Sequence, residues 1–139
     1  MIFLTLNDIC EINQEWIQRY GGRYIALDNN LCNRASLEYI LEAIQYPIFG
    51  KQLFPRLIDK AAALAWWVIE GHIFNDGNKR TGMQAAIELF ELNGATSIFD
   101  KESAVAISMM VANRQISLEE LTDIFGMYVQ TGSGDPYQI

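Results

Sequence analysis

One short segment of the sequence gathers the side chains that could do chemistry. Residues 71–81 read GHIFNDGNKRT, and nine of these eleven residues are polar or glycine, whereas the flanking segments are strongly apolar. His72 is the only histidine of the chain, and imidazole is the side chain best suited to accept and donate protons near neutral pH. His72 is therefore the candidate general base, although a lone histidine is also common as a structural residue.

The residues that follow His72 supply what a phosphate group requires. Asp76 offers a carboxylate for Mg²⁺, a cation that takes oxygen ligands and is often shared with substrate phosphates. Gly77 permits a ligand to approach the backbone closely, and Asn78 begins a helical pattern whose free N–H groups favour phosphate. Lys79 and Arg80 add two cations. A base, a metal ligand, free amides and cations within nine residues predict phosphoryl or nucleotidyl transfer.

The same segment also fits a plain connection between two helices. Residues 75–77 (NDG) are typical of a turn, and Lys79 with Arg80 would then be a solvated charged pair. A Walker A loop is excluded, because His72 stands where that motif requires its first glycine.

Residues 72–80, HIFNDGNKR, resemble the signature of the Fic/Doc superfamily, and more closely its Doc (death-on-curing) toxin branch. The resemblance extends over residues 4–128 and includes RYGG at 19–22, FG at 49–50 and FELNG at 90–94. It implies the Fic fold, ATP as a substrate and Mg²⁺ as a cofactor. It also implies individual roles: His72 as the base that takes the proton from a target hydroxyl, Phe74 as the buried anchor of the loop, Asp76 as the Mg²⁺ ligand, Gly77, Asn78 and Lys79 as the anion cradle, and Arg80 as the phosphate-binding arginine.

Two positions bear on which group is transferred. The AMP-transferring Fic branch has a glycine where this chain has Lys79, and a second arginine where this chain has Met83. Doc-like proteins have the same lysine, bind the nucleotide in the reversed sense and transfer the γ-phosphate to a translation elongation factor. The resemblance thus implies a toxin–antitoxin protein kinase, with elongation factor Tu as the candidate target. Two alternatives stay open: a Fic-type AMP transferase that carries out AMPylation, and a non-catalytic Fic-fold interaction module.

The resemblance implies two kinds of protein partner. Residues 47–54, PIFGKQLF, lie where the family has a flap that holds an extended target segment by β-type backbone pairing. The docking residues would be Phe49, Gly50, Lys51, Gln52 and Leu53; the alternative is an ordinary loop with Phe49 and Phe54 in the core. No serine or threonine has a glutamate four residues later, as the self-inhibitory helix of the family requires. Inhibition is therefore expected from a separate antitoxin.

Hydrophobic periodicity predicts the helices that must position the loop. Apolar residues recur at helical spacing in six segments: after Asn7 and Asp8 up to Tyr20, at 37–44, from Pro55 towards Gly71, at 79–92, at 105–112, and after a capping box at Ser117 and Glu120. No segment alternates as a strand does. We expect an all-α, compact single-domain bundle of about six helices over residues 1–130, with a flexible C-terminal tail at 131–139.

Composition narrows the partners. The chain has 139 residues, half of them hydrophobic, and a formal net charge of −7. Such an acidic chain is a poor ligand for nucleic acid or an anionic membrane. Cys10 and Cys32 lack the spacing of metal ligands, and we expect reduced, mostly buried thiols. The N-terminus lacks the basic residues of a signal peptide, and no apolar run is long enough to span a bilayer. A cytoplasmic protein is expected.

Overall fold

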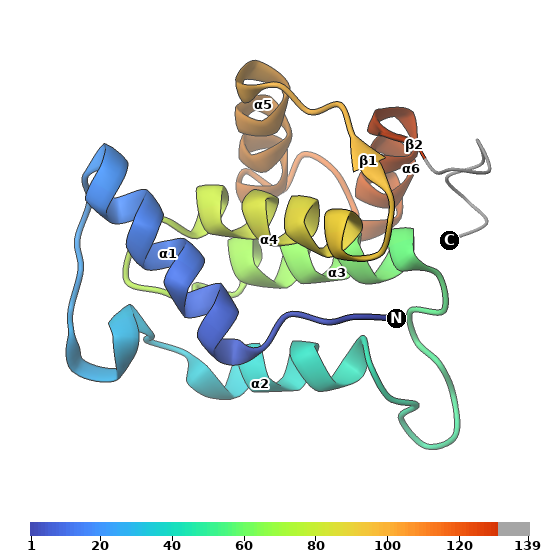
Figure 1. The fold of residues 1–139 in the computed structure, drawn as a ribbon, viewed down its shortest axis with the longest axis horizontal. Helices are drawn as coiled ribbons and strands as arrows, with labels where there is room; N and C mark the ends of the chain where they lie inside the picture. Colours follow the sequence, from blue (N-terminus) through green and yellow to red (C-terminus); the bar gives the residue numbers. More distant parts are fainter. Residues whose placement is uncertain (131–139) are drawn as a thin grey trace.

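The computed structural model of the chain describes residues 1–130 and is mostly helical, as expected (Figure 1). The tail expected at 131–139 lies outside the described residues. The elements follow in the order α1 (Leu6–Tyr20), the 3₁₀ helix η1 (Leu27–Asn30), α2 (Arg34–Ala43), α3 (Leu57–Glu70), α4 (Asn78–Leu92), β1 (Thr96–Ser97), α5 (Lys101–Ala112), α6 (Leu118–Tyr128) and β2 (Val129–Gln130). No helix within residues 1–130 is both long and apolar enough to cross a membrane.

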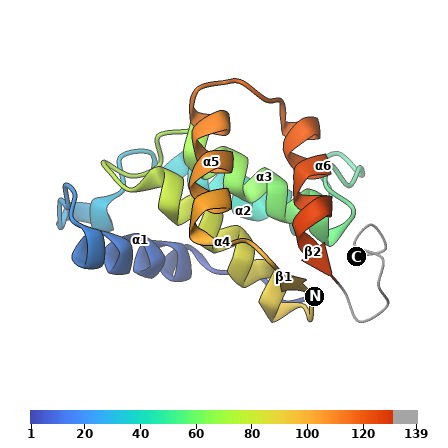
Figure 2. The same cartoon turned by 90° about the horizontal axis from the view of Figure 1, so that it is seen from above.

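The antiparallel pair of α3 and α4 forms the centre of the molecule. Ten of the fourteen residues of α3 are buried. At Gly82 of α4 an added Cβ would come within 3.0 Å of the Ala65 carbonyl oxygen and 2.8 Å of Cγ1 of Ile69. The two helices therefore pack with almost no side chain between them at this point, close to the connection between them. Helices α1 and α2 cover one side of the pair, and α5 and α6 cover the other (Figures 1 and 2).

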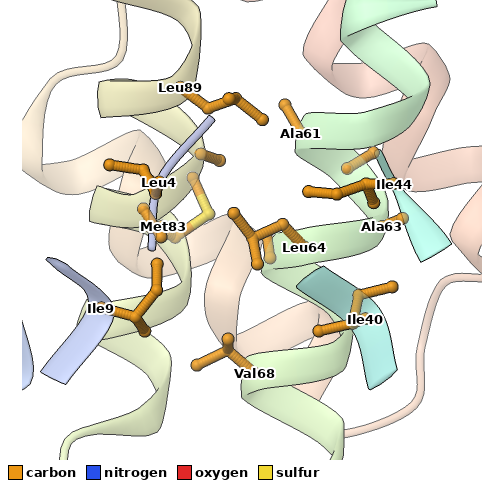
Figure 3. Packing of buried hydrophobic residues seen from close by; sticks show 14 of the residues in the cluster. Leu4, Ile9, Ile40, Ile44, Ala61, Ala63, Leu64, Val68, Met83 and Leu89 are labelled. Atoms are coloured by element: carbon orange, nitrogen blue, oxygen red, sulfur yellow. The ribbon is translucent and has the colours of Figure 1, made fainter. Parts of the chain in front are cut away.

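The hydrophobic core fills the space between these layers (Figure 3). Leu64 and Val68 of α3 meet Met83 and Leu89 of α4, and Ile9 of α1 closes the cluster from one side. All five side chains are buried.

Helix ends follow the local hydrogen-bonding rules, but α2 and α5 begin three and four residues before the apolar residues that predicted them. Helix α1 is capped by Thr5 rather than by Asn7 or Asp8: the Thr5 hydroxyl accepts a hydrogen bond from the amide of Asp8 at 3.1 Å, and the Asp8 carboxylate accepts one from the Thr5 amide at 2.7 Å. Asp8 thus occupies the third position of a capping box, where an acid reaches back to the cap. The capping box expected at Ser117 and Glu120 is confirmed.

Two short strands were not predicted. Thr96–Ser97 pairs antiparallel with Val129–Gln130 and ties the end of α6 to the segment after α4. Two residues of each strand are too few to show an alternating pattern, so a ladder of this length gives no periodic signal in the sequence.

We expect Leu64→Ala to lower the free energy of unfolding by about 2–5 kcal/mol, because it opens a cavity between α3 and α4. Leu92→Ala is the matched control: Leu92 ends the neighbouring helix and is 42% exposed, and its truncation should cost less than about 1 kcal/mol. Chemical denaturation followed by circular dichroism measures both values, and equal losses would contradict this description of the core.

Candidate active site

The connection between α3 and α4, residues 71–77, opens onto a cavity of about 390 Å³. Figure 1 shows this connection at the same end of the molecule as the C-terminal end of α1. Most of the candidate residues that precede or begin α4 line the cavity together: His72, Asp76, Gly77, Asn78, Lys79 and Arg80. Gly21, from the end of α1, and Arg114, from the connection between α5 and α6, also line it.

The backbone at His72 has an unusual conformation. Its φ angle is +47°, in the left-handed region that L residues seldom adopt. The His72 carbonyl accepts a hydrogen bond from the thiol of Cys32 at 2.9 Å, and the next carbonyl, of Ile73, accepts from the amides of Cys32 and Asn33. These bonds hold the turn in place, and the His72 side chain remains exposed and lines the cavity. Cys32 is itself exposed, so the expectation of a buried thiol is wrong at this position.

Phe74 lies two residues further on and points the other way. Its side chain is 1% exposed, and its backbone pairs with Leu31 in an isolated antiparallel bridge. The side-chain amide of Asn78 bonds to the backbone of Phe74 twice: it accepts from the Phe74 amide and donates to the Phe74 carbonyl, both at 2.9 Å. The Asn78 side chain therefore holds the loop, and only its backbone is left for an anion.

Asp76 is fixed by the backbone on both carboxylate oxygens. Oδ2 accepts from the amide of Arg23 and Oδ1 from the amide of Gly77, each at 2.8 Å. These hydrogen bonds, with Lys79 and Arg80 nearby, hold the pKa of the Asp76 carboxyl below its usual value. The carboxylate is therefore ionised at neutral pH and exposed to the cavity.

The surroundings of Asp76 fit a cation that is shared with a ligand. Within residues 1–130 no three histidine, cysteine or acidic side chains converge on a metal site. A Mg²⁺ ion bound to Asp76 would take its other oxygen ligands from substrate phosphates and water, which is the usual arrangement for this ion. Gly22 keeps room for this carboxylate, because a Cβ there would lie 2.9 Å from Asp76 Oδ2.

The start of α4 provides positive potential beside Asp76. Gly77 precedes the helix with φ +80°, and the first N–H groups of a helix have no intrahelical partners. Lys79 is exposed at the cavity, and the Arg80 guanidinium lies 4.5 Å above the ring of Tyr20. Amides, a lysine and an arginine held by an aromatic ring together make a surface whose chemistry suits an anion.

Sequence reasoning missed the buried asparagines behind this loop. Asn13 of α1 and Asn30 of η1 are both fully buried. Asn13 Nδ2 donates to the Asp76 carbonyl at 2.8 Å and to the Thr81 hydroxyl at 3.1 Å, while Asn13 Oδ1 accepts from Asn30 at 3.0 Å. The carbonyl of Asn30 in turn accepts from the backbone and side-chain amides of Asn75. The available signal was a polar residue, Asn13, beside Ile12 on the apolar face of its helix.

Residues 49–53 lie away from this cavity. Ile48 and Lys51 exchange backbone hydrogen bonds at 2.9 and 3.0 Å, which makes a tight turn with Phe49 and Gly50 at its tip, both with positive φ. Phe49 is fully exposed, so its expected alternative place in the core is wrong, whereas Phe54 packs against the core.

The physical reason for this separation is the length of α3. Lys60 Nζ donates to the carbonyl oxygens of Ile44 and Phe54, both at 2.6 Å, and so fixes the connection at the start of α3. The loop at 71–77 lies at the other end of the same helix (Figure 1). The structure therefore does not bring the expected docking residues Phe49 to Leu53 together with His72; residues 21–33 border the loop instead.

Comparison with known proteins shows the family to which the chain belongs. The profile of the Fic/DOC family matches residues 3–90. A protein named Toxin Doc from Mycolicibacterium smegmatis is 37% identical over 104 residues, which cover 73% of this chain and 76% of that protein. A protein named Protein kinase doc from Escherichia phage P1 is 24% identical over 123 residues, covering 88% of this chain and 92% of that protein. The chain belongs to the Fic/DOC family.

We expect Asn13→Leu to lower the free energy of unfolding by about 3 kcal/mol or more, because it leaves the Asp76 carbonyl, the Thr81 hydroxyl and the Asn30 amide without their partner. Gln14→Leu, an exposed amide on the same helix, is the control and should change stability by less than about 0.5 kcal/mol. Urea denaturation compares the two variants, and equal stabilities would show that the network contributes nothing.

Proposed function

We propose that the chain is a Doc-like toxin that transfers the γ-phosphate of ATP to a hydroxyl group of a target protein. The observation that carries the proposal is the convergence of a histidine, a carboxylate, a helix N-terminus and two cations on one cavity. The names of its relatives, a toxin and a protein kinase, support the same reading. A translation elongation factor, with elongation factor Tu as the candidate, is the proposed target.

In this proposal each residue of the cavity has a defined task. His72 accepts the proton of the target hydroxyl as its oxygen attacks the γ-phosphorus. The new P–O bond forms as the bond from the γ-phosphorus to the β–γ bridging oxygen breaks, and ADP leaves. The first amides of α4, with Lys79 and Arg80, hold the negative oxygens in place. Asp76 would hold Mg²⁺, which offsets phosphate charge when bound.

The left-handed backbone at His72 has a place in this scheme. Backbone strain of this kind costs of order 1–3 kcal/mol and persists only where neighbouring bonds enforce it. The hydrogen bonds from Cys32 and Asn33 to the carbonyls of His72 and Ile73 provide that enforcement. The backbone that carries the imidazole is thus fixed at the cavity before substrate arrives, which reduces the ordering that the reaction itself requires.

Two positions favour transfer of the γ-phosphate over transfer of AMP. Lys79 is exposed at the cavity, where a bulky side chain obstructs the backbone approach that a glycine would allow. Met83 is 3% exposed and lies in the core with Leu64 (Figure 3), so it offers no charge to a phosphate. The nucleotide orientation of the AMP-transferring branch is disfavoured at both points.

A separate antitoxin is the proposed inhibitor. A second hollow of about 240 Å³ adjoins the cavity and shares Lys79 and Arg80 with it. Its lining is largely apolar and includes Trp16, Ile87 and Phe99. An amphipathic helix laid across the cavity would bury its apolar face in this hollow and block access to His72.

We expect His72→Ala to reduce phosphate transfer by about 10²–10⁴-fold while Mg·ATP binding stays close to wild type, because the imidazole acts on the hydroxyl. Asp76→Ala should instead weaken Mg·ATP binding itself. Calorimetry measures binding, and expression in bacteria gives a second readout: wild type should arrest growth and His72→Ala should not. Transfer at the wild-type rate by His72→Ala would refute the proposed mechanism. Growth arrest by His72→Ala would refute it too, because a non-catalytic interaction module would not need this histidine.

We expect label from [γ-³²P]ATP, and not from [α-³²P]ATP, to reach a protein in cell extract. Mass spectrometry of the labelled protein should find one added phosphate, and an added AMP would refute the kinase assignment in favour of AMP transfer. Lys79→Gly is the diagnostic variant: a gain of α-label with it would identify this side chain as the selector of nucleotide orientation.

A further inference from the structure

Arg114 is a cation of the cavity that belongs to neither the loop nor α4. It follows the end of α5 and lines the same cavity as His72, Asp76, Lys79 and Arg80. The end of α5 reaches the α3–α4 pair near the side where these two helices are connected (Figures 1 and 2). The side chain is 83% exposed and meets Glu70, the last residue of α3.

The backbone at Arg114 has a conformation that favours glycine. The amide of Arg114 bonds to the Val111 carbonyl and the amide of Gln115 to the Met110 carbonyl, at 3.0 and 2.9 Å. This pair of bonds is the Schellman ending of a helix, in which the left-handed residue is usually glycine. Arg114 occupies that position with φ +57°. An arginine in this conformation costs stability that glycine would not cost. Strain of this kind at the edge of a cavity points to a role for the side chain.

The contact with Glu70 leaves the guanidinium available. Arg114 Nε lies 3.4 Å from Glu70 Oε2, and no residue of the described part of the chain accepts a hydrogen bond from its two terminal nitrogens. The other carboxylate oxygen, Glu70 Oε1, is buried and has no hydrogen-bond partner among residues 1–130. A loose pair at an exposed site contributes little to stability. The pair therefore orients the Arg114 side chain and leaves its two terminal nitrogens available to a ligand.

We propose that Arg114 is a phosphate-binding residue of this site and that Glu70 is its positioning residue. The ligand is a polyphosphate. Where this polyphosphate is the triphosphate of ATP, the inference rests on the proposed function. Planar guanidinium groups bind phosphate oxygens through two parallel hydrogen bonds. Three cations, Lys79, Arg80 and Arg114, line the cavity together with two carboxylates, those of Asp76 and Glu70. The net charge of the whole protein is −7. The cavity is thus locally positive on an acidic protein, which attracts anions to it.

The contribution of Arg114 comes from a different part of the chain than the other two cations. Lys79 and Arg80 are consecutive on the first turn of α4, whereas Arg114 reaches the cavity from the turn between α5 and α6. Groups on separate elements can hold a phosphate chain at more than one point, which orients it as well as attracting it. Arg114 therefore supplies charge that Met83, buried in the core, does not.

Titration calorimetry of the intact chain with Mg·ATP, and separately with Mg·tripolyphosphate, tests the inference. We expect Arg114→Gly and Arg114→Gln to weaken binding of both ligands about tenfold, the effect of one charge-assisted hydrogen-bonded contact. Arg114→Lys should retain most of the affinity. Without ligand, the thermal unfolding midpoint of Arg114→Gly should not fall, because glycine relieves the left-handed strain. Unchanged affinity in Arg114→Gly would overturn the inference.

Two further variants separate direct contact from indirect effects. Arg34→Gln removes an exposed arginine that is also paired with carboxylates, those of Asp28 and Glu38, and it should bind both ligands as wild type does. If Arg114 merely neutralised Glu70, the double variant Glu70→Gln/Arg114→Gln would regain wild-type affinity, which would overturn the inference; a persistent tenfold loss supports direct contact.

The two ligands keep this inference distinct from the proposed function. Binding of tripolyphosphate that depends on Arg114, without transfer of label from ATP to any protein, would refute the proposed function and leave the phosphate site standing. Transfer of label with full affinity in Arg114→Gly would do the reverse. Absence of binding of either ligand to the wild type would overturn both.

Discussion

The geometry of the cavity depends on one buried side chain, the amide of Asn13. A polar group inside a protein core is tolerated only when its hydrogen bonds are complete, and this amide completes them with the Asp76 carbonyl, the Thr81 hydroxyl and Asn30. These three partners lie in the loop, at the start of α4 and in η1. The polar loop can therefore cross between two apolar helices without unsatisfied groups beneath it, and its exposed side is free for a ligand.

Around this network, backbone groups make most of the hydrogen bonds that hold the loop in place. Amides of Arg23 and Gly77 hold the Asp76 carboxylate, and carbonyls of His72 and Ile73 are held from the segment before α2. Backbone groups have few internal degrees of freedom, so a site fixed in this way loses little entropy on binding. The close approach of α3 and α4 at Gly82 gives these contacts a rigid base.

The charge distribution of the chain gives two hollows of its surface opposite electrostatic character. The net charge is −7, yet Lys79, Arg80 and Arg114 converge on one cavity. A different hollow, between α1 and α4, is lined by five carboxylates from Asp8, Glu11, Glu15, Glu88 and Glu91. Burial, with the charges of Glu91, Glu15 and Asp8, raises the pKa of the Glu88 carboxyl. An anionic ligand is thus attracted to one part of the surface and repelled from another.

The sequence alone determined the features that depend on neighbours along the chain. Helical periodicity placed the six helices of the described chain, and capping chemistry placed the start of α6, because both act within a few residues. The candidate residues from His72 to Arg80 meet in space for the same reason: nine consecutive residues that turn into a helix must lie close together. Tertiary structure decided the contacts between residues that lie far apart in the sequence. Asn13 and Asp76 are hydrogen-bonded although they are 63 residues apart in the sequence. Arg114 reaches the cavity from the connection between α5 and α6. Residues 49–53 and His72 lie at opposite ends of α3. Such pairings depend on how apolar faces pack against each other, and a one-dimensional pattern shows which faces are apolar but not which of them meet.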